Sequence, residues 1–401
     1  MSRIGKLMES MTSRERMLAA LSCQEVDYIP CSFMIFDALR MGCSSYEEFI
    51  RRETAMGLDA VVTLPPRPPI VKNDYYDLHC LPVNYHPEVR IVEKTIPAEE
   101  GNHPLMVKEY ITPAGTLRAE VWKTADWKWG DHIPFLDDYI VPRSRKYLVS
   151  DAKDLPALRY LLVPPTQAEI EQFGEDAKAA IQLAREHQLL VSNGWGVGAD
   201  LIGWICGLVN LIYDVYDKAA YIQELLEIIY QWNKTRMEVI LETGIDLYIK
   251  RAWYENTDYW SPSNWRKFLL PILKKETDLC HQAGVKFAYI ITSACMPLLD
   301  SIAEAGVDCI IGVDPADWDL AAAKEKLKHQ VCLWGGVTGH LTVEQGNEED
   351  IRAAVRNAIA ELSPGYGFIL SPVDNIRYDA PDREKALKNV EIFIDEWKKR
   401  R

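Results

Sequence analysis

VCLWGGVTGH (Val331–His340) and GFILSPVDN (Gly367–Asn375) decide the fold of this chain. In the first, a short apolar run leads into Gly335-Gly336; in the second, an apolar run ends at Asp374-Asn375. An amphipathic, capped helical pattern joins them, so the stretch predicts a strand, a helix and a second strand. In parallel α/β barrels the active site lies where strands end, so the same stretch predicts where chemistry occurs.

The same alternation extends through most of the chain. Helices have recognisable starts: Thr12 and Glu15 have capping-box spacing, Asp217 is expected to cap a long helix, and Pro262 suits a first turn. The order and the length predict a (β/α)₈ TIM barrel rather than an open sheet, and no GxGxxG follows the first strand. About eight short apolar runs are the predicted strands: Tyr28–Met34, Ala60–Leu64, Leu189–Ser192, Asp246–Lys250, Lys286–Ile291, Cys309–Val313, Val331–Trp334 and Phe368–Leu370.

Residues 66–165 interrupt the alternation. The proline-rich run Leu64–Pro69 stops regular structure, and Leu105–Trp122 holds two β-like runs joined by Thr112–Gly115, which predicts a β-hairpin. The block has no strong apolar periodicity of its own. We therefore expect residues 1–401 to form one barrel domain with an N-terminal helical extension and an insertion at about 66–165.

Composition narrows the class of protein. The chain has 401 residues, is 48% hydrophobic and carries a net charge of −14, which disfavours nucleic acid as a partner. Nine scattered cysteines, no CxxC pair, no signal peptide and no membrane-length apolar run predict a cytoplasmic protein with reduced thiols. Twelve Trp and nineteen Tyr fit either a large core or a pocket for a flat ligand.

Polar and aromatic residues follow most of the predicted strands. Lys250 and Glu255 lie after one of them, where they can serve catalysis or form a structural ion pair. Asp374 and Asn375 can bond their own backbone, but their place at a strand end favours a site. Asp314 can belong to a site or to a simple turn. No HxH or HExxH occurs, so no metal site is predicted. The candidate residues are Asp37, Asn193, Lys250, Arg251, Trp253, Tyr254, Glu255, Thr292, Ser293, Asp314, Trp334, Asp374 and Asn375.

Three stretches together resemble the uroporphyrinogen decarboxylase superfamily. They are TSRERMLAALSCQEVDYIP (Thr12–Pro30), PLLDSIAEAGVDCIIGVDP (Pro297–Pro315) and GGVTGHLTVEQGNEEDIRAAVRNAI (Gly335–Ile359), the last followed by GFILSP. The resemblance implies a (β/α)₈ barrel and suggests a homodimer. The superfamily contains porphyrinogen decarboxylases and corrinoid-linked methyltransferases, and Thr112–Thr116 (TPAGT) is more similar to the methyltransferase-like branch.

The decarboxylase branch implies cations that this chain lacks. Those enzymes hold a polycarboxylate with the arginines of Met-Arg-Gln-Ala-Gly-Arg and use an aspartate on the second strand. Here the first motif corresponds to Met34–Leu39, followed by Arg40, and the second position falls in Val62–Pro65, which has no acid. Without those cations a polyanion would be bound poorly.

The thiol-methyltransferase branch implies zinc held by a His-x-Cys pair and a later Cys. Here the corresponding positions are in Ile290–Ser293 and at Asp374, and Cys295 is out of register. The zinc ligand set is therefore absent, which disfavours methyl transfer to a thiol.

We therefore expect a methyltransferase that moves a methyl group from a small methylated, for example methoxyaromatic, donor to a corrinoid protein. Glu255 or Asp374 would be the acid, with Lys250 or Arg251 stabilising a phenolate or binding a carboxylate. Residues 66–165 would form a lid or a docking surface. There are two alternatives. One is a decarboxylase of another carboxylated molecule, which Arg40 and Arg251 could bind. The other is a non-catalytic barrel that binds a tetrapyrrole or a corrinoid. The other expected substrate-binding residues are Asp37, Asn193, Trp253, Tyr254, Thr292, Ser293, Trp334 and Asn375.

Overall fold

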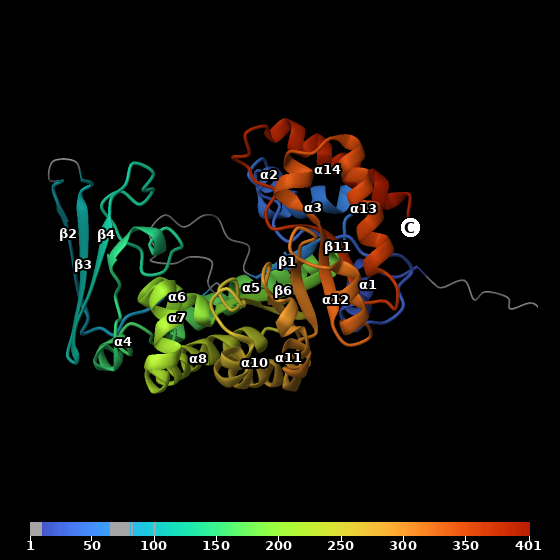
Figure 1. The fold of residues 1–401 in the computed structure, drawn as a ribbon. Coiled ribbons are helices and arrows are strands. Elements are labelled where there is room, and N and C mark those ends of the chain that lie inside the picture. Colours follow the sequence, from blue (N-terminus) through green and yellow to red (C-terminus); the bar gives the residue numbers. More distant parts are fainter. Residues whose placement is uncertain (1–9, 65–80, 82, 99–101) are drawn as a thin grey trace, which may run out of the picture.

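The centre of the computed structural model, which describes residues 10–64, 81, 83–98 and 102–401, is a curled parallel sheet of seven strands (Figure 1). Neighbouring strands follow the order of the chain, as they do in a (β/α)₈ barrel, so the predicted fold class is confirmed. The strands are β1 (Val61–Thr63), β6 (Leu190–Val197), β7 (Leu247–Arg251), β8 (Lys286–Ile290), β9 (Cys309–Val313), β10 (Cys332–Thr338) and β11 (Phe368–Val373).

An extended segment takes the place of the eighth strand. Cys31 forms an isolated parallel bridge with Leu370 of β11, and Ile35 forms another with Asn375. On the other side, the N–H of Asp59, just before β1, donates to the carbonyl of Cys31 at 2.7 Å. The expectation of eight regular strands was thus wrong in detail, because Tyr28–Met34 contributes single bridges rather than a continuous ladder.

Alternate residues of each strand face the inside of the barrel. On β7, Leu247 and Ile249 belong to the interior cluster, whereas Tyr248 packs in the larger cluster beneath the outer helices. The interior cluster also holds Met17 and Leu21 of α1 (Ser13–Leu21) beside the residues that begin the strands. Helix α1 therefore closes the end of the barrel where strands start, and the opposite end remains for binding.

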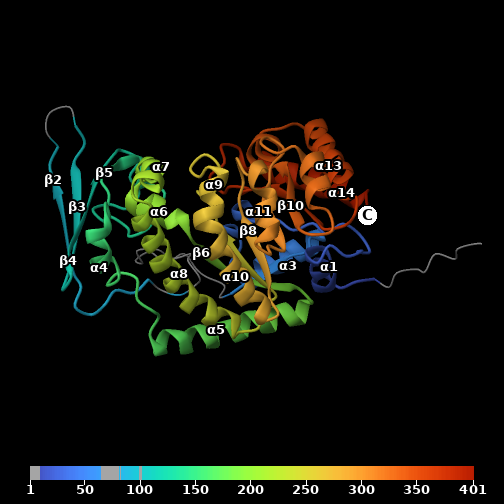
Figure 2. The same cartoon turned by 60° about the horizontal axis from the view of Figure 1, so that its bottom comes forward.

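Helices surround the sheet and bury one face each against it (Figures 1 and 2). The predicted capping box, Thr12 with Glu15, begins α1, and a second one, Asn347 with Asp350, begins α13 (Glu348–Leu362). The other helices around the sheet are α3 (Tyr46–Met56), α5 (Gln167–His187), α8 (Ala219–Leu241), α10 (Leu270–Gln282), α11 (Leu299–Glu304), α12 (Leu320–Leu327), α13 (Glu348–Leu362) and α14 (Arg383–Lys398).

The connection between β6 and α8 differs from the prediction. Two further helices, α6 (Ala199–Cys206) and α7 (Leu208–Asp217), occupy it. Asp217 ends α7 and does not cap α8, whose first turn follows Lys218 without a side-chain cap. Because every residue of α6 is buried, its sequence has no polar face that would reveal a helix.

Strand β10 continues through the two glycines that were predicted to end it. Gly335 has φ +148° and Gly336 has φ +101°, and a Cβ on Gly335 would lie 2.7 Å from the carbonyl oxygen of Val313. The pairing with β9 also shifts register between Trp334 and Gly335. Glycine is needed here so that β10 can pass close to β9 and still reach Thr338.

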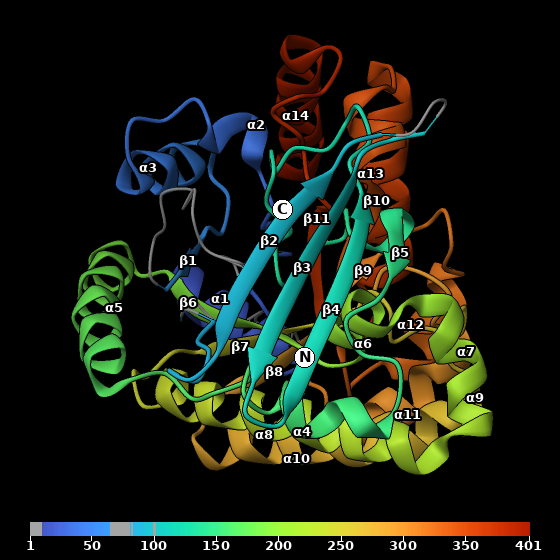
Figure 3. The same ribbon diagram turned by 90° about the vertical axis from the view of Figure 1, so that its left-hand side faces the viewer.

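The insertion forms an antiparallel sheet of four strands that stands beside the barrel (Figures 1 and 3). The predicted hairpin is β3 (Leu105–Thr112) and β4 (Gly115–Trp122), flanked by β2 (Arg90–Ile96) and β5 (Ser144–Lys146). It has a small core of its own, which its sequence periodicity did not reveal, because residues outside the strands supply most of it. That core contains Met106, Val121, Trp127, Ile133 and Ile140.

Among the described residues, no single helix has the length and apolarity of a membrane span. The apolar helices α6 and α7 reach that length only as a pair, and the pair is bent by 108°.

Candidate functional site

A cavity of about 320 Å³ opens where the strands of the barrel end. The loops after β8, β9 and β11 contribute most of its lining, as expected for a parallel barrel. We call it the mouth cavity; the described residues that line it are Trp253, Thr292, Ser293, Asp314, Ala316, Asp317, Val373 and Asp374. Five of the candidates predicted from the sequence thus meet here: Trp253, Thr292, Ser293, Asp314 and Asp374.

Asp374 follows β11 directly and has a left-handed backbone, with φ +66°. Aspartate and asparagine adopt this conformation more readily than most residues. The side chain is open to solvent on one side, but the surrounding protein removes part of its hydration and raises the pKa of Asp374. The carboxylate of Asp314 adds to this rise, while Arg377 opposes it. Asp374 is therefore protonated more readily than an ordinary aspartate.

Asp314 and Asp317, in the loop after β9, are oriented by hydrogen bonds from that loop, from the loop after β8 and from the end of β10. The hydroxyl of Thr338, at the end of β10, donates to Asp314 at 2.7 Å, and the N–H of Ala316 donates to the same oxygen at 2.9 Å. Asp317 accepts the N–H of Ala294 at 2.7 Å. These bonds all come from neutral donors, so none of them pairs either carboxylate with a cation.

Asp37 and Asn375 form a reciprocal pair beside the mouth cavity. The amide of Asn375 donates to Asp37 at 2.8 Å, and the N–H of Asp37 donates back at 3.2 Å. Asp37 begins α2 (Asp37–Arg40), so this pair joins the closing segment of the barrel to the end of β11. Neither residue lines the mouth cavity.

Lys250 points away from the mouth cavity. It lies two residues after Tyr248 on β7, so both side chains face the outer helices. Its ammonium lies 2.6 Å from Glu276 of α10 and 3.6 Å from Glu255. Glu255 also accepts the N–H of Ala199 at 2.8 Å, at the start of α6, and the hydroxyl of Tyr289. Both Lys250 and Glu255 are buried behind the barrel wall, where they join β7, α6 and α10.

Arg251, one residue further, is held at the rim by two carboxylates. It donates to Asp200 of α6 at 3.0 Å and to Asp138 of the insertion at 2.8 Å. The indoles of Trp204 and Trp253 flank its guanidinium, with centroids 4.6 and 4.0 Å away. Burial raises the pKa of Asp200 to about 6, although Arg251 opposes the rise.

Asp138 fastens the insertion to this rim. Besides Arg251, it accepts the hydroxyl of Tyr254 at 2.6 Å and the indole N–H of Trp204 at 2.7 Å. The hydroxyl of Tyr254, an expected substrate-binding residue, is thereby used in this contact. Asp138 and Asp200 were not among the candidates, because neither follows a predicted strand and no sequence motif marks them.

Asn193 and Trp334 are buried and line no part of the mouth cavity. Asn193 accepts the N–H of Gly194 within β6. Trp334 lies in the interior cluster, against which Trp253 packs, and its indole N–H donates to the carbonyl of Ser32 at 2.9 Å. Trp334 is thus part of the barrel core rather than a wall of the cavity.

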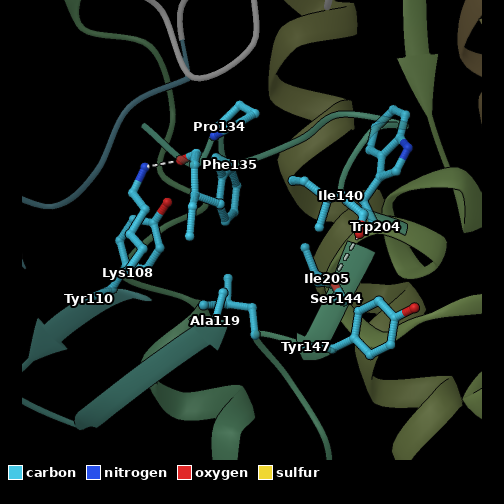
Figure 4. Close-up of a pocket in the computed structure, with 12 residues that line it drawn as sticks. Lys108, Tyr110, Ala119, Pro134, Phe135, Ile140, Ser144, Tyr147, Trp204 and Ile205 are labelled. Carbon is cyan, nitrogen blue, oxygen red and sulfur yellow. Dashed lines mark hydrogen bonds between the residues drawn. The ribbon is translucent and has the colours of Figure 1, made fainter. Parts of the chain in front are cut away.

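A second, much smaller cavity lies between the insertion and α6 (Figure 4). Its volume is about 10 Å³, which is room for about one water molecule. Lys108 reaches the carbonyl of Ile133 across one side at 2.7 Å, and Trp204 closes another side. This space is a packing defect at the contact of the insertion with the barrel, so the mouth cavity is the candidate site.

The mouth cavity does not fit the zinc of the thiol-methyltransferase branch. The stretch corresponding to the His-x-Cys pair, Ile290–Ser293, and the position of the later Cys, Asp374, do reach its lining. They contribute Thr292, Ser293 and Asp374, which offer hydroxyls and one carboxylate. Zinc prefers thiolate and imidazole. In the described part of the chain, no group of three or more His, Cys, Asp or Glu side chains is arranged to hold a metal ion.

Comparisons with known proteins agree with this fold. A methyltransferase from Methanosarcina mazei superimposes with a TM-score of 0.60 at 15% identity, covering 97% of this chain and 99% of the other. A B12-independent methionine synthase from Shewanella sp. W3-18-1 gives a TM-score of 0.38 at 10% identity, covering 57% of this chain and 67% of the other. No curated protein matches the sequence. The sequence profile described as Uroporphyrinogen decarboxylase (URO-D) matches residues 141–399, and the chain therefore belongs to the uroporphyrinogen decarboxylase family.

Proposed function

We propose that this protein transfers a methyl group from a small methylated donor to a corrinoid carried by a separate protein. The composition of the mouth cavity is the observation that supports this choice most strongly. The cavity has room for a small organic molecule, one aromatic wall in Trp253, a protonatable group in Asp374, and no cation among the described residues that line it. The barrel is also the one found in the Methanosarcina mazei methyltransferase.

The alternative decarboxylase reaction needs cations that face the substrate. Arg251 is already engaged by Asp138 and Asp200. Arg40 is exposed at the end of α2, where it lies over the ring of Tyr46, 5.7 Å from its centroid. Because neither arginine lines the mouth cavity, a carboxylated substrate would meet aspartates there instead of cations.

Methyl transfer makes smaller demands, which the mouth cavity meets. The bond from the methyl carbon to the donor's oxygen or nitrogen breaks, and its electron pair stays on that atom. The corrinoid acceptor supplies the pair for the new bond. An oxygen leaving group needs a proton, which Asp374 would donate, and such general acid catalysis is worth on the order of 10²–10⁴ in rate. Trp253 would hold the donor in place for transfer.

The insertion would serve as the docking surface for the corrinoid protein. It is fastened at the rim through Asp138, beside Arg251 and Tyr254, so its position relative to the mouth cavity is defined. A partner that bound both the insertion and the barrel would have its cofactor near the strand ends. Lys250 and Glu255 would act as positioning residues, since they hold β7 and α6 together.

The proposal is tested by methyl transfer from a panel of methoxyarenes and methylamines to cob(I)alamin, followed by its absorption spectrum. We expect transfer from at least one donor and a large loss in Asp374→Asn. The control is Asp278→Asn, the same change at an exposed position of α10. Folded protein that transfers no methyl group from any of the donors would contradict the proposal, as would an Asp374→Asn variant as active as Asp278→Asn.

A further inference from the structure

The mouth cavity carries three carboxylates, those of Asp314, Asp317 and Asp374. Their hydrogen-bond donors are a hydroxyl and backbone N–H groups, and none of the three forms an ion pair with another described residue. Three negative charges around one small space create a potential that attracts cations and repels anions. The charge of the lining therefore restricts what can bind.

Nearby cations do not cancel this charge. Arg251 lies against Trp253, but it is shared by the carboxylates of Asp138 and Asp200. Arg377, beyond Asp374, makes its ion pair with buried Glu344, at 2.7 Å. Each arginine thus has at least one carboxylate of its own, and no cation among the described residues forms an ion pair with the three aspartates of the mouth cavity.

From this arrangement we infer that the methyl donor is itself a cation, a methylated ammonium compound. The inference rests on the proposed function and names the class of its substrate. A bare metal ion fits less well: about 320 Å³ is far more room than an ion needs, and the aspartates are not gathered into a metal-binding group. The indole of Trp253 offers an apolar surface for methyl groups, which a metal ion would not use.

A cationic donor also simplifies the chemistry. When the bond from methyl carbon to nitrogen breaks, its electron pair stays on nitrogen, and the leaving group is a neutral amine. The reduced corrinoid acceptor supplies both electrons of the new bond to carbon, so the reaction balances without a proton. The aspartates would hold the charged substrate and lose their hold on the neutral product. They would act by binding, so removing one should raise KM more than it lowers kcat.

The charge preference is measured with two probes of the same shape. Choline carries a trimethylammonium group, and 3,3-dimethylbutan-1-ol replaces it with a neutral tert-butyl group; 4-methoxybenzoate serves as an anionic donor analogue. Titration calorimetry on the full chain should show choline binding at least about tenfold tighter than the alcohol, since one opposite charge at close range contributes more than 1.4 kcal/mol. We expect Asp374→Asn and Asp314→Asn each to weaken choline binding about tenfold, with Asp278→Asn unchanged. Asparagine suits the left-handed backbone at position 374, so that variant should fold.

Four results would overturn the inference: no binding of choline, equal binding of the alcohol, tighter binding of 4-methoxybenzoate, or displacement of choline by micromolar Mg²⁺. The transfer assay keeps the two proposals apart. Choline binding that depends on Asp374, with no methyl transfer from any donor, would support the charge class and refute the methyltransferase function. Transfer from methoxyarenes alone, by protein that does not bind choline, would support the methyltransferase function and refute the cationic class of donor.

Discussion

Lys250→Met should destabilise this protein severely without touching the mouth cavity. Methionine has a similar volume, so the change removes a charge and leaves the packing nearly intact. Lys250, Glu255 and Glu276 are 3%, 1% and 2% exposed, and the lysine is the cation between the two carboxylates. Without it, both acids remain buried without compensation, which costs about 3–5 kcal/mol. An unfolding entropy of about 2.1 cal/mol/K per residue over 401 residues is about 0.84 kcal/mol/K, so the melting temperature should fall by about 4–6 °C.

The loss should depend on pH in a defined direction. Burial raises the pKa of Glu276 above its ordinary value, with Lys250 opposing the rise, so removing the lysine raises that pKa further. A carboxyl whose pKa is higher in the folded state than in the unfolded state destabilises the fold fully when pH exceeds the folded-state pKa. The penalty declines as pH falls from that value and is gone below the unfolded-state pKa. The difference between Lys250→Met and wild type should therefore shrink between pH 8 and pH 5.

Scanning calorimetry across that pH range measures both effects. The matched control is Lys234→Met on α8, which removes a cation from the surface pair with Glu238, whose side chains are 38% and 44% exposed, and should cost less than about 1 kcal/mol. Adding Glu276→Gln to Lys250→Met should recover part of the loss. A Lys250→Met variant that melts with wild type, or one whose loss is the same at every pH, would refute the buried-cluster reasoning.

Three further changes test other parts of the structure. Asp138→Ala should free the insertion from the rim, so that limited proteolysis cuts between residues 83 and 165 faster while the barrel stays intact; unchanged cleavage would contradict this anchor. Gly335→Ala should lower the free energy of unfolding by several kcal/mol, because the new Cβ would lie 2.7 Å from a carbonyl oxygen and the backbone has φ +148°. Gly174→Ala, which has open space around it on α5, should raise that free energy by about 0.5–1 kcal/mol. Urea unfolding that ranked the two variants in the opposite order would contradict this prediction. Choline affinity should fall as the pH is lowered through the pKa of Asp374, which lies above 3.8, because only the ionised carboxylate attracts the cation. Calorimetry should find that the affinity of Asp374→Asn depends less on pH.

The ends of regular elements were predictable because they depend on neighbours in the sequence. Thr12 and Asn347 bond residues three positions on, and the apolar run Cys309–Val313 is a strand with those same limits. Such local patterns place a polar residue after a strand, and Thr292, Ser293 and Asp374 followed from this rule. The same rule could not show which of these residues share a cavity, because the loops after strands take their own course.

The direction of a side chain was harder to predict than its position. Lys250 and Arg251 are neighbours at the end of one strand, yet one faces the outer helices and the other the rim. Their partners, Glu276 and Asp138, lie 26 and 113 residues away in the chain, so no local pattern could pair them. Trp334 looked like a cavity wall, but the register of β10 puts it in the core.

The sequence by itself determined the family, through the stretches that resemble it. It also determined the parallel barrel and the end of the barrel at which to look for chemistry, since these two depend on short-range apolar periodicity, caps and strand order. Only the tertiary structure decided which charges neutralise each other. Arg251 and Lys250 are engaged by carboxylates from distant elements, whereas Asp314, Asp317 and Asp374 converge on one cavity. The net charge of a site is a sum over three-dimensional neighbours, and that sum is the basis on which we propose a cationic methyl donor.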